Sequence, residues 1–162
     1  MDFGYILLLL IAGCVGTAAM DGVKYVGAKL RLIGGVKMDL LGRWAYGMPR
    51  GQFVYADIHD AQAVDNEVLL GWIFHYIVGA VVALGYPIML MMLNLGLDSD
   101  PIFYATVFGI ATSVFPWFIV YPAFGVGFFG SRAPKAAKPV LTSLVSHTFY
   151  GLGIGLTISL LG

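Results

Sequence analysis

Charged side chains are scarce in this sequence: Asp, Glu, Lys and Arg make up 11% of its 162 residues, against about 25% in an average soluble domain. Hydrophobic residues reach 59% and the mean hydropathy is +0.87, which excludes an ordinary soluble fold. Nine basic residues are balanced by nine acidic ones, so the excess of positive charge typical of nucleic-acid-binding proteins is absent. The single cysteine, Cys14, excludes an intrachain disulfide and a Cys-x-x-Cys redox pair.

The sequence does have four long windows without a charged residue, each near or above the roughly 18–20 residues with which a helix crosses a bilayer. They are residues 3–20, 68–97, 101–131 and 139–162. We therefore predict an all-α membrane protein with four transmembrane helices, which form a single domain over residues 1–162. The predicted helices cover about residues 3–33, 67–96, 101–121 and 139–161.

The distribution of Lys and Arg predicts the orientation of these helices. Six of the nine basic residues fall in the segment 21–67, and the other three fall at 132–138. The amino terminus and the turn at 98–100 carry none. Because positive residues accumulate in cytoplasmic loops, both basic loops are predicted to be cytoplasmic and both termini to lie outside.

The cytoplasmic segment 21–67 contains a short amphipathic pattern. Val36, Leu40, Leu41 and Trp44 recur on one helical face, as in a helix that lies in the headgroup plane. This interfacial helix either anchors the loop or binds a particular lipid, and the residues do not decide between the two.

The third window is interrupted by prolines. Asp100 and Pro101 form a helix start, with a capping residue followed by proline at the first helical position. Pro116 predicts a kink, and Pro122 with the glycines after it predicts that the helix breaks before Arg132.

Small residues line one face of the second and fourth helices. Residues four apart share a helix face, and each row contains one histidine: Gly71, His75 and Gly79 on the second helix, and His147, Gly151 and Gly155 on the fourth. Small residues let helix backbones approach closely in a bilayer. We predict that Gly71, Gly79, Gly151 and Gly155 are helix-packing positions and that both rows face inward.

Asp21, His75 and His147 are expected at similar depth, near the inner leaflet, and to form one polar site. Ionisable groups at this depth are costly and mark functional sites. Three chemistries fit: proton relay by the histidines, binding of zinc or another divalent metal, and axial ligation of a b-type haem by the two imidazoles. The alternative is that each histidine only hydrogen-bonds a neighbouring helix and fixes the packing.

A second group of candidate metal ligands lies in the loop: Asp57, His59 and Asp60. Motifs of soluble enzymes are otherwise lacking. The spacing in the stretch from Gly22 to Lys29 misses that of a phosphate-binding loop, and no nucleophile-histidine pair is indicated. The sequence gives no positive support for an enzymatic activity.

Several strings of this sequence resemble the bacterial membrane family catalogued as domain of unknown function 2938. They are Ala19-Met20-Asp21, Gly42-Arg43-Trp44, Met48-Pro49-Arg50-Gly51-Gln52-Phe53, Gly71-Trp72-Ile73-Phe74-His75-Tyr76, Gly125-Val126-Gly127, Ser131-Arg132-Ala133-Pro134 and His147-Thr148-Phe149-Tyr150-Gly151-Leu152-Gly153. The resemblance covers nearly the whole chain. It implies a small four-helix protein of the bacterial inner membrane and brings no reaction or substrate.

Three functions follow as hypotheses. The leading one is transport or ion handling through Asp21, His75 and His147, in a homo-oligomer or a larger membrane complex because four short helices enclose little volume. The second is an accessory subunit whose glycine faces dock onto a larger complex. The third is a membrane protein that binds a metal or haem.

Overall fold

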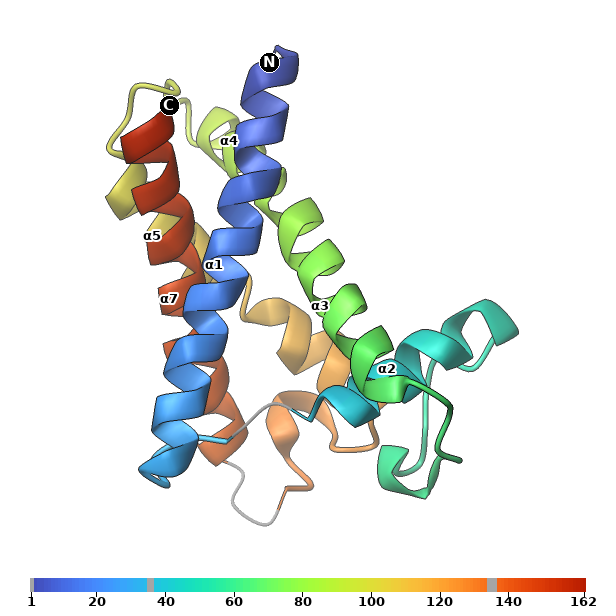
Figure 1. The fold of residues 1–162 in the computed structure, drawn as a ribbon. Helices are drawn as coiled ribbons and strands as arrows, with labels where there is room; N and C mark the ends of the chain where they lie inside the picture. The colour runs from blue at the N-terminus through green and yellow to red at the C-terminus, as the bar shows by residue number, and fades with distance from the viewer. Residues whose placement is uncertain (1, 35–36, 134–136) are drawn as a thin grey trace. The chain divides into compact units, whose positions relative to one another are not determined.

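The computed structural model describes residues 2–34, 37–133 and 137–162, and all regular structure within these ranges is helical (Figure 1). The α-helices are α1 (Phe3–Lys29), α2 (Met38–Gly47), α3 (Glu67–Ala83), α4 (Gly85–Met92), α5 (Pro101–Ala111), α6 (Tyr121–Ala123) and α7 (Ala137–Leu161). The predicted all-α class is confirmed for the described residues.

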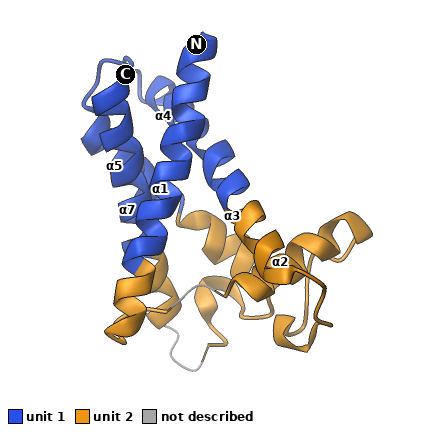
Figure 2. Ribbon diagram, in the orientation of Figure 1, with its two compact units in different colours: residues 1–23, 76–112, 144–162 blue, residues 24–75, 113–143 orange. Residues whose placement is uncertain are grey.

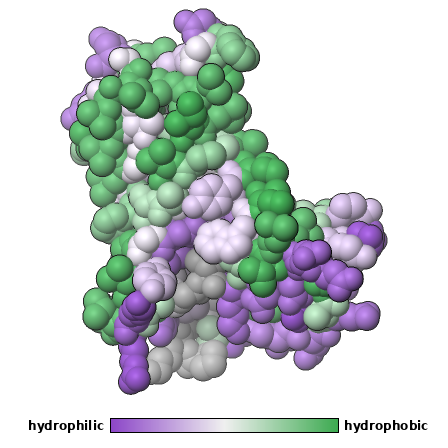
Figure 3. Space-filling view, in the orientation of Figure 1, coloured by the Kyte–Doolittle hydropathy of each residue, from purple (hydrophilic) through white to green (hydrophobic). Residues whose placement is uncertain are grey.

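Four helical stretches are long and apolar enough to cross a membrane: Phe3–Lys29, Glu67–Met92, Pro101–Ala123 and Lys138–Leu161. Their number and approximate positions agree with the prediction. In the space-filling view, apolar side chains cover the visible face over α3 and the amino-terminal half of α1, whereas hydrophilic residues gather over α2 and the chain that follows it (Figure 3). The side of the membrane on which each end lies stays a prediction.

The first two spans end earlier than predicted, at Lys29 and Met92 rather than at residues 33 and 96. Each is closed by a pair of backbone hydrogen bonds that satisfies the last carbonyls of a helix. After α1, the N–H groups of Arg31 and Leu32 donate to the carbonyl oxygens of Ala28 and Gly27. This closure needs a left-handed residue, usually glycine, but here the residues are Arg31 (φ 60°) and, after α4, Asn94 (φ 55°). The first helix therefore ends before residue 33, where its end was predicted.

The third span is broken, as its prolines predict. The Asp100 carboxylate accepts hydrogen bonds from the N–H groups of Ile102 and Phe103, and Pro101 is the first residue of α5. α5 ends at Ala111, a turn at Thr112-Ser113 follows, and the backbone then forms a π-helical turn, η3 (Pro116–Val120), before α6. The interruption thus begins before Pro116, inside the apolar stretch.

The chain divides into two compact units (Figure 2). Unit 1 comprises Met1–Val23, Tyr76–Thr112 and Leu144–Gly162, and its core is built from side chains of α1, α4, α5 and α7, including Leu9, Tyr86, Leu90 and Ile154. The amino and carboxyl ends lie at the same end of this unit (Figure 1). Its described residues carry no Lys or Arg.

Unit 2 comprises Lys24–His75 and Ser113–Ser143 and contains every described Lys and Arg. Its core forms around Trp44 of α2, whose ring packs edge-on against Phe74 and Phe124 and whose indole N–H donates to the Phe53 carbonyl oxygen. Leu40 and Trp44 are 4% and 6% exposed. The apolar face of α2, which the sequence assigned to the membrane surface, is therefore covered largely by protein. Val36, also assigned to this face, lies outside the described residues.

Candidate functional site

The side chain of His147 is hydrogen-bonded to Thr112 inside unit 1. Thr112 caps the carboxyl end of α5, His147 lies on α7, and the distance from His147 Nδ1 to Thr112 Oγ1 is 2.8 Å. The Thr112 hydroxyl donates to the Gly109 carbonyl oxygen at 2.6 Å. Thr112 is buried and His147 is half-buried, with its ring edge-on to that of Tyr150. An ionisable imidazole thus sits beside the point at which the third span is interrupted.

The carboxyl end of α5 makes this position electrostatically favourable for a cation. The last carbonyl groups of a helix lack intrahelical partners and carry a partial negative charge. Because α5 ends at Ala111, inside the stretch Pro101–Ala123, this charge lies within the apolar stretch and not at its end. Discontinuous helices of transporters use such helix ends to bind Na⁺ or H⁺.

Close packing of α5 on α7 brings Thr112 to His147. A Cβ atom added at Gly109 would collide with the His147 carbonyl oxygen and would lie 2.6 Å from Gly151 Cα. A Cβ atom added at Gly151 would collide with the Ala105 carbonyl oxygen and would lie 2.8 Å from Thr106 Cα. No side chain larger than hydrogen fits at either position unless the helices move apart, so these two glycines set the distance between the imidazole and the threonine.

The other glycines predicted as packing positions also lie at close helix contacts. A Cβ atom at Gly155 would lie 2.6 Å from the Pro101 carbonyl oxygen, again between α7 and α5. At Gly79 of α3 it would collide with Thr17 Oγ1 of α1, and at Gly71 it would collide with the Met38 carbonyl oxygen of α2. The row of small residues on α3 therefore serves two partners, α1 within unit 1 and α2 within unit 2.

The two other members of the predicted polar site belong to different units. Asp21 lies on α1 in unit 1 and is half-buried. His75 lies on α3 in unit 2, where its ring packs edge-on to Trp72. The convergence of Asp21, His75 and His147 stays a prediction.

Asp57, His59 and Asp60 form a capped turn. The Asp57 carboxylate accepts a hydrogen bond from the backbone N–H of His59 at 2.9 Å and lies 2.7 Å from its Nδ1, and Lys37 Nζ is 3.0 Å from His59 Nε2. Within residues 2–34, 37–133 and 137–162, no three His, Cys, Asp or Glu side chains are grouped so that they could hold a metal ion. The metal hypothesis for these residues gains no support from this geometry.

Asp57→Asn is expected to flatten the loss of stability at acidic pH. The hydrogen bonds that Asp57 accepts from His59 lower the pKa of its carboxyl below its ordinary value. A lowered pKa in the folded state stabilises the fold above the unfolded-state pKa, and this contribution is lost as the pH falls through the folded-state value. Melting temperatures between about pH 7 and pH 3 test this. Asp60→Asn is the control, since no hydrogen bond to the Asp60 carboxylate is found among the described residues. An equal effect of the two variants on the pH dependence of the melting temperature would contradict the role of Asp57.

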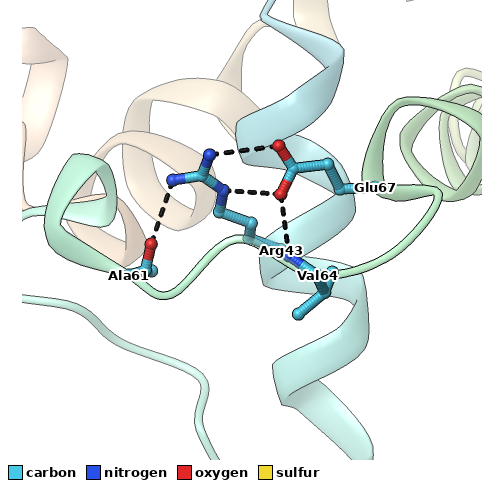
Figure 4. Close-up of polar contacts among 4 residues, drawn as sticks. All are labelled: Arg43, Ala61, Val64 and Glu67. Carbon is cyan, nitrogen blue, oxygen red and sulfur yellow. Dashed lines mark hydrogen bonds and ion pairs between the residues drawn. The ribbon is translucent and has the colours of Figure 1, made fainter.

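An ion pair that was not predicted from the sequence joins α2 to the start of α3 (Figure 4). Arg43 Nε and Nη2 donate to the two carboxylate oxygens of Glu67 at 2.8 and 3.0 Å, and Nη1 donates to the Ala61 carbonyl oxygen at 3.0 Å. Glu67 also accepts from the N–H of Val64. The hydrogen bonds to Glu67 raise the pKa of Arg43 further above its ordinary value. This clamp ties the loop before α3 to α2 and fixes the base of the second span.

Arg43→Lys is expected to lower the melting temperature of the detergent-solubilised protein more than Arg50→Lys does. Lysine keeps the charge but cannot make two parallel hydrogen bonds to a carboxylate and a third to Ala61. Arg50 is the matched control because it is exposed and stacks on Tyr46 in the same segment. Equal losses for the two variants would show that the clamp adds nothing.

Comparison with known proteins places the chain in one family. The family model described as "Protein of unknown function (DUF2938)" matches residues 10–160. The match runs from α1 to the last turn of α7 and includes Asp21, His75, Thr112 and His147. No curated protein and no solved structure matches the chain.

Proposed function

The chain belongs to the family described as "Protein of unknown function (DUF2938)", and because that description names no activity, we propose from the geometry that it is a small membrane protein that moves protons or ions. The observation that carries the proposal is the hydrogen bond between His147 and Thr112 at the interruption of the third span. Irregular backbone at membrane depth is tolerated where it is buried in protein or lines a water-filled cavity. A histidine held at such a point can gain and lose a proton near neutral pH.

The proposed location is the bacterial inner membrane, with both termini outside. Every described Lys and Arg belongs to unit 2, and unit 1 contains the two chain ends and the turn after α4. Cytoplasmic loops are the ones that carry the excess of basic residues. The charge distribution therefore supports unit 2 as the cytoplasmic part.

Asp21 and His75 are proposed as further members of the proton or ion path. Both are ionisable residues in apolar helices. In membrane proteins such residues face protein or water rather than lipid. Four helices enclose too little volume for a wide pore, so we propose that the path is completed by assembly into a homo-oligomer.

The test is ion flux in liposomes that contain the purified full-length chain. A pH gradient, a Na⁺ gradient and a K⁺ gradient are applied in turn, with fluorescent indicators trapped inside. We expect the pH gradient to collapse faster than in protein-free liposomes prepared in parallel. Fluxes equal to the protein-free value for all three gradients would overturn the proposal.

An accessory subunit of a larger membrane complex is the second candidate function. One observation favours it: only 11% of the apolar window in the second span, Glu67–Met92, is buried inside the chain, which leaves a long apolar face on α3 and α4 for a partner. Extraction from native membranes in a mild detergent distinguishes the two. A stoichiometric partner that accompanies the chain, together with absence of flux, would favour the accessory role.

A further inference from the structure

The two hydrogen bonds of the Thr112 hydroxyl determine which nitrogen of His147 carries the proton. A threonine hydroxyl has one proton to donate and can also accept. Thr112 Oγ1 lies 2.6 Å from the Gly109 carbonyl oxygen, and a carbonyl oxygen can only accept, so the hydroxyl proton must point to it. Thr112 has then no proton left for His147 Nδ1, which is 2.8 Å away. Nδ1 must therefore be the donor of this second hydrogen bond.

We infer that neutral His147 is held as the tautomer with its proton on Nδ1, so that Nε2 is the nitrogen that takes up and releases protons, and that Thr112 is the residue that positions it. The tautomer is inferred from the geometry alone. The uptake and release of a proton at Nε2 rest on the proposed function. Protonation at Nε2 gives an imidazolium whose Nδ1–H still donates to Thr112. Loss of the same proton restores the starting tautomer.

Positioning by the second nitrogen is how proteins usually select the working nitrogen of a histidine. The helix contact supports this role, because Gly109 and Gly151 bring the α5 backbone against α7 at this level. Gly109 contributes both the close contact and the carbonyl that takes the Thr112 proton. The carbonyl oxygen that takes the Thr112 proton is therefore held in place by the backbone packing of α5 on α7.

The experiment is nitrogen NMR of the full-length chain in bilayers, with ¹⁵N-labelled histidine, at about pH 9, where a free imidazole is neutral. The chain has three histidines, and the difference from a His147→Gln sample assigns the His147 signals. We expect a protonated, pyrrole-type signal for Nδ1 and an unprotonated, pyridine-type signal for Nε2. A protonated Nε2 in the wild-type chain would overturn the inference.

Two threonine variants test the positioning role. Thr112→Val removes the acceptor and is expected to populate the form protonated at Nε2, whereas Thr112→Ser keeps a hydroxyl and is expected to restore the wild-type spectrum. Thr106→Val is the matched control, because Thr106 also donates to a backbone carbonyl of its own helix, that of Ile102, at 2.7 Å. An unchanged Thr112→Val spectrum would overturn the positioning role.

Flux measurements on the same samples separate this inference from the proposed function. The wild-type tautomer as inferred, without flux, would leave the inference intact and refute proton transport. Proton flux together with a neutral imidazole that carries its proton on Nε2 would support proton transport and refute the inferred tautomer. If both hold, Thr112→Val should lower the proton flux severalfold and Thr112→Ser should recover it.

Discussion

Gly151→Ala is expected to destabilise the folded chain by about 1–3 kcal/mol, the usual cost of overpacking, although it adds a single methyl group. That methyl would collide with the Ala105 carbonyl oxygen and crowd Thr106 Cα. Both contacts are to backbone, which a change of rotamer cannot relieve. Unfolding in detergent micelles, followed by circular dichroism or proteolysis, measures the loss.

Gly22→Ala is the matched control for this substitution. Gly22 also lies within a long helix, α1, but a Cβ atom added there meets nothing within 4 Å. The same change should therefore be neutral, or stabilising by up to about 1 kcal/mol through helix propensity. If Gly151→Ala proved as harmless as Gly22→Ala, α5 and α7 would not be packed as described.

His147→Gln is expected to reduce the proton flux by at least about tenfold, at the lower end of what a proton-transfer group contributes. The amide of glutamine can still hydrogen-bond to Thr112 but does not take up a proton near neutral pH. The fold should therefore survive while the flux is lost. Dye-monitored flux in liposomes, with the melting temperature of the same preparation, gives both quantities.

His59→Gln provides the comparison for His147→Gln. His59 lies in the exposed turn beside Asp57 and Lys37, outside the apolar helices, and its substitution should leave the flux unchanged. Full flux in His147→Gln would mean that this imidazole only packs against Thr112. Misfolding of His147→Gln with normal folding of His59→Gln would indicate the same.

The spans could be predicted from the sequence because the bilayer imposes a one-dimensional rule, a minimum length of apolar chain between charges. The helix ends could not. Arg31 and Asn94 adopt the left-handed conformation that usually belongs to glycine, so residue type does not mark where α1 and α4 end. Backbone closure, rather than residue type, ends these two helices.

The polar contacts were harder to predict because they depend on the register between helices. His147 was identified from its rarity in an apolar window, but its partner Thr112 lies 35 residues away, and only the approach of Gly109 to Gly151 brings the two together. A signal did exist for the clamp on Arg43, since Glu67 is the sole glutamate in the sequence and opens the second span beside the basic segment. To infer the ion pair from this signal, one would have to know that α2 packs on α3.

The most direct test of proton transport is to ask whether protons from bulk water reach His147 in a membrane. In bilayers, the ¹⁵N signals of His147 are followed from about pH 9 to about pH 5, a range that spans ordinary histidine titration. We expect Nε2 to gain a proton within this range while the Nδ1 proton stays in its hydrogen bond to Thr112. An imidazole that remains neutral throughout would show that protons do not reach this histidine, and proton transport through it would be refuted.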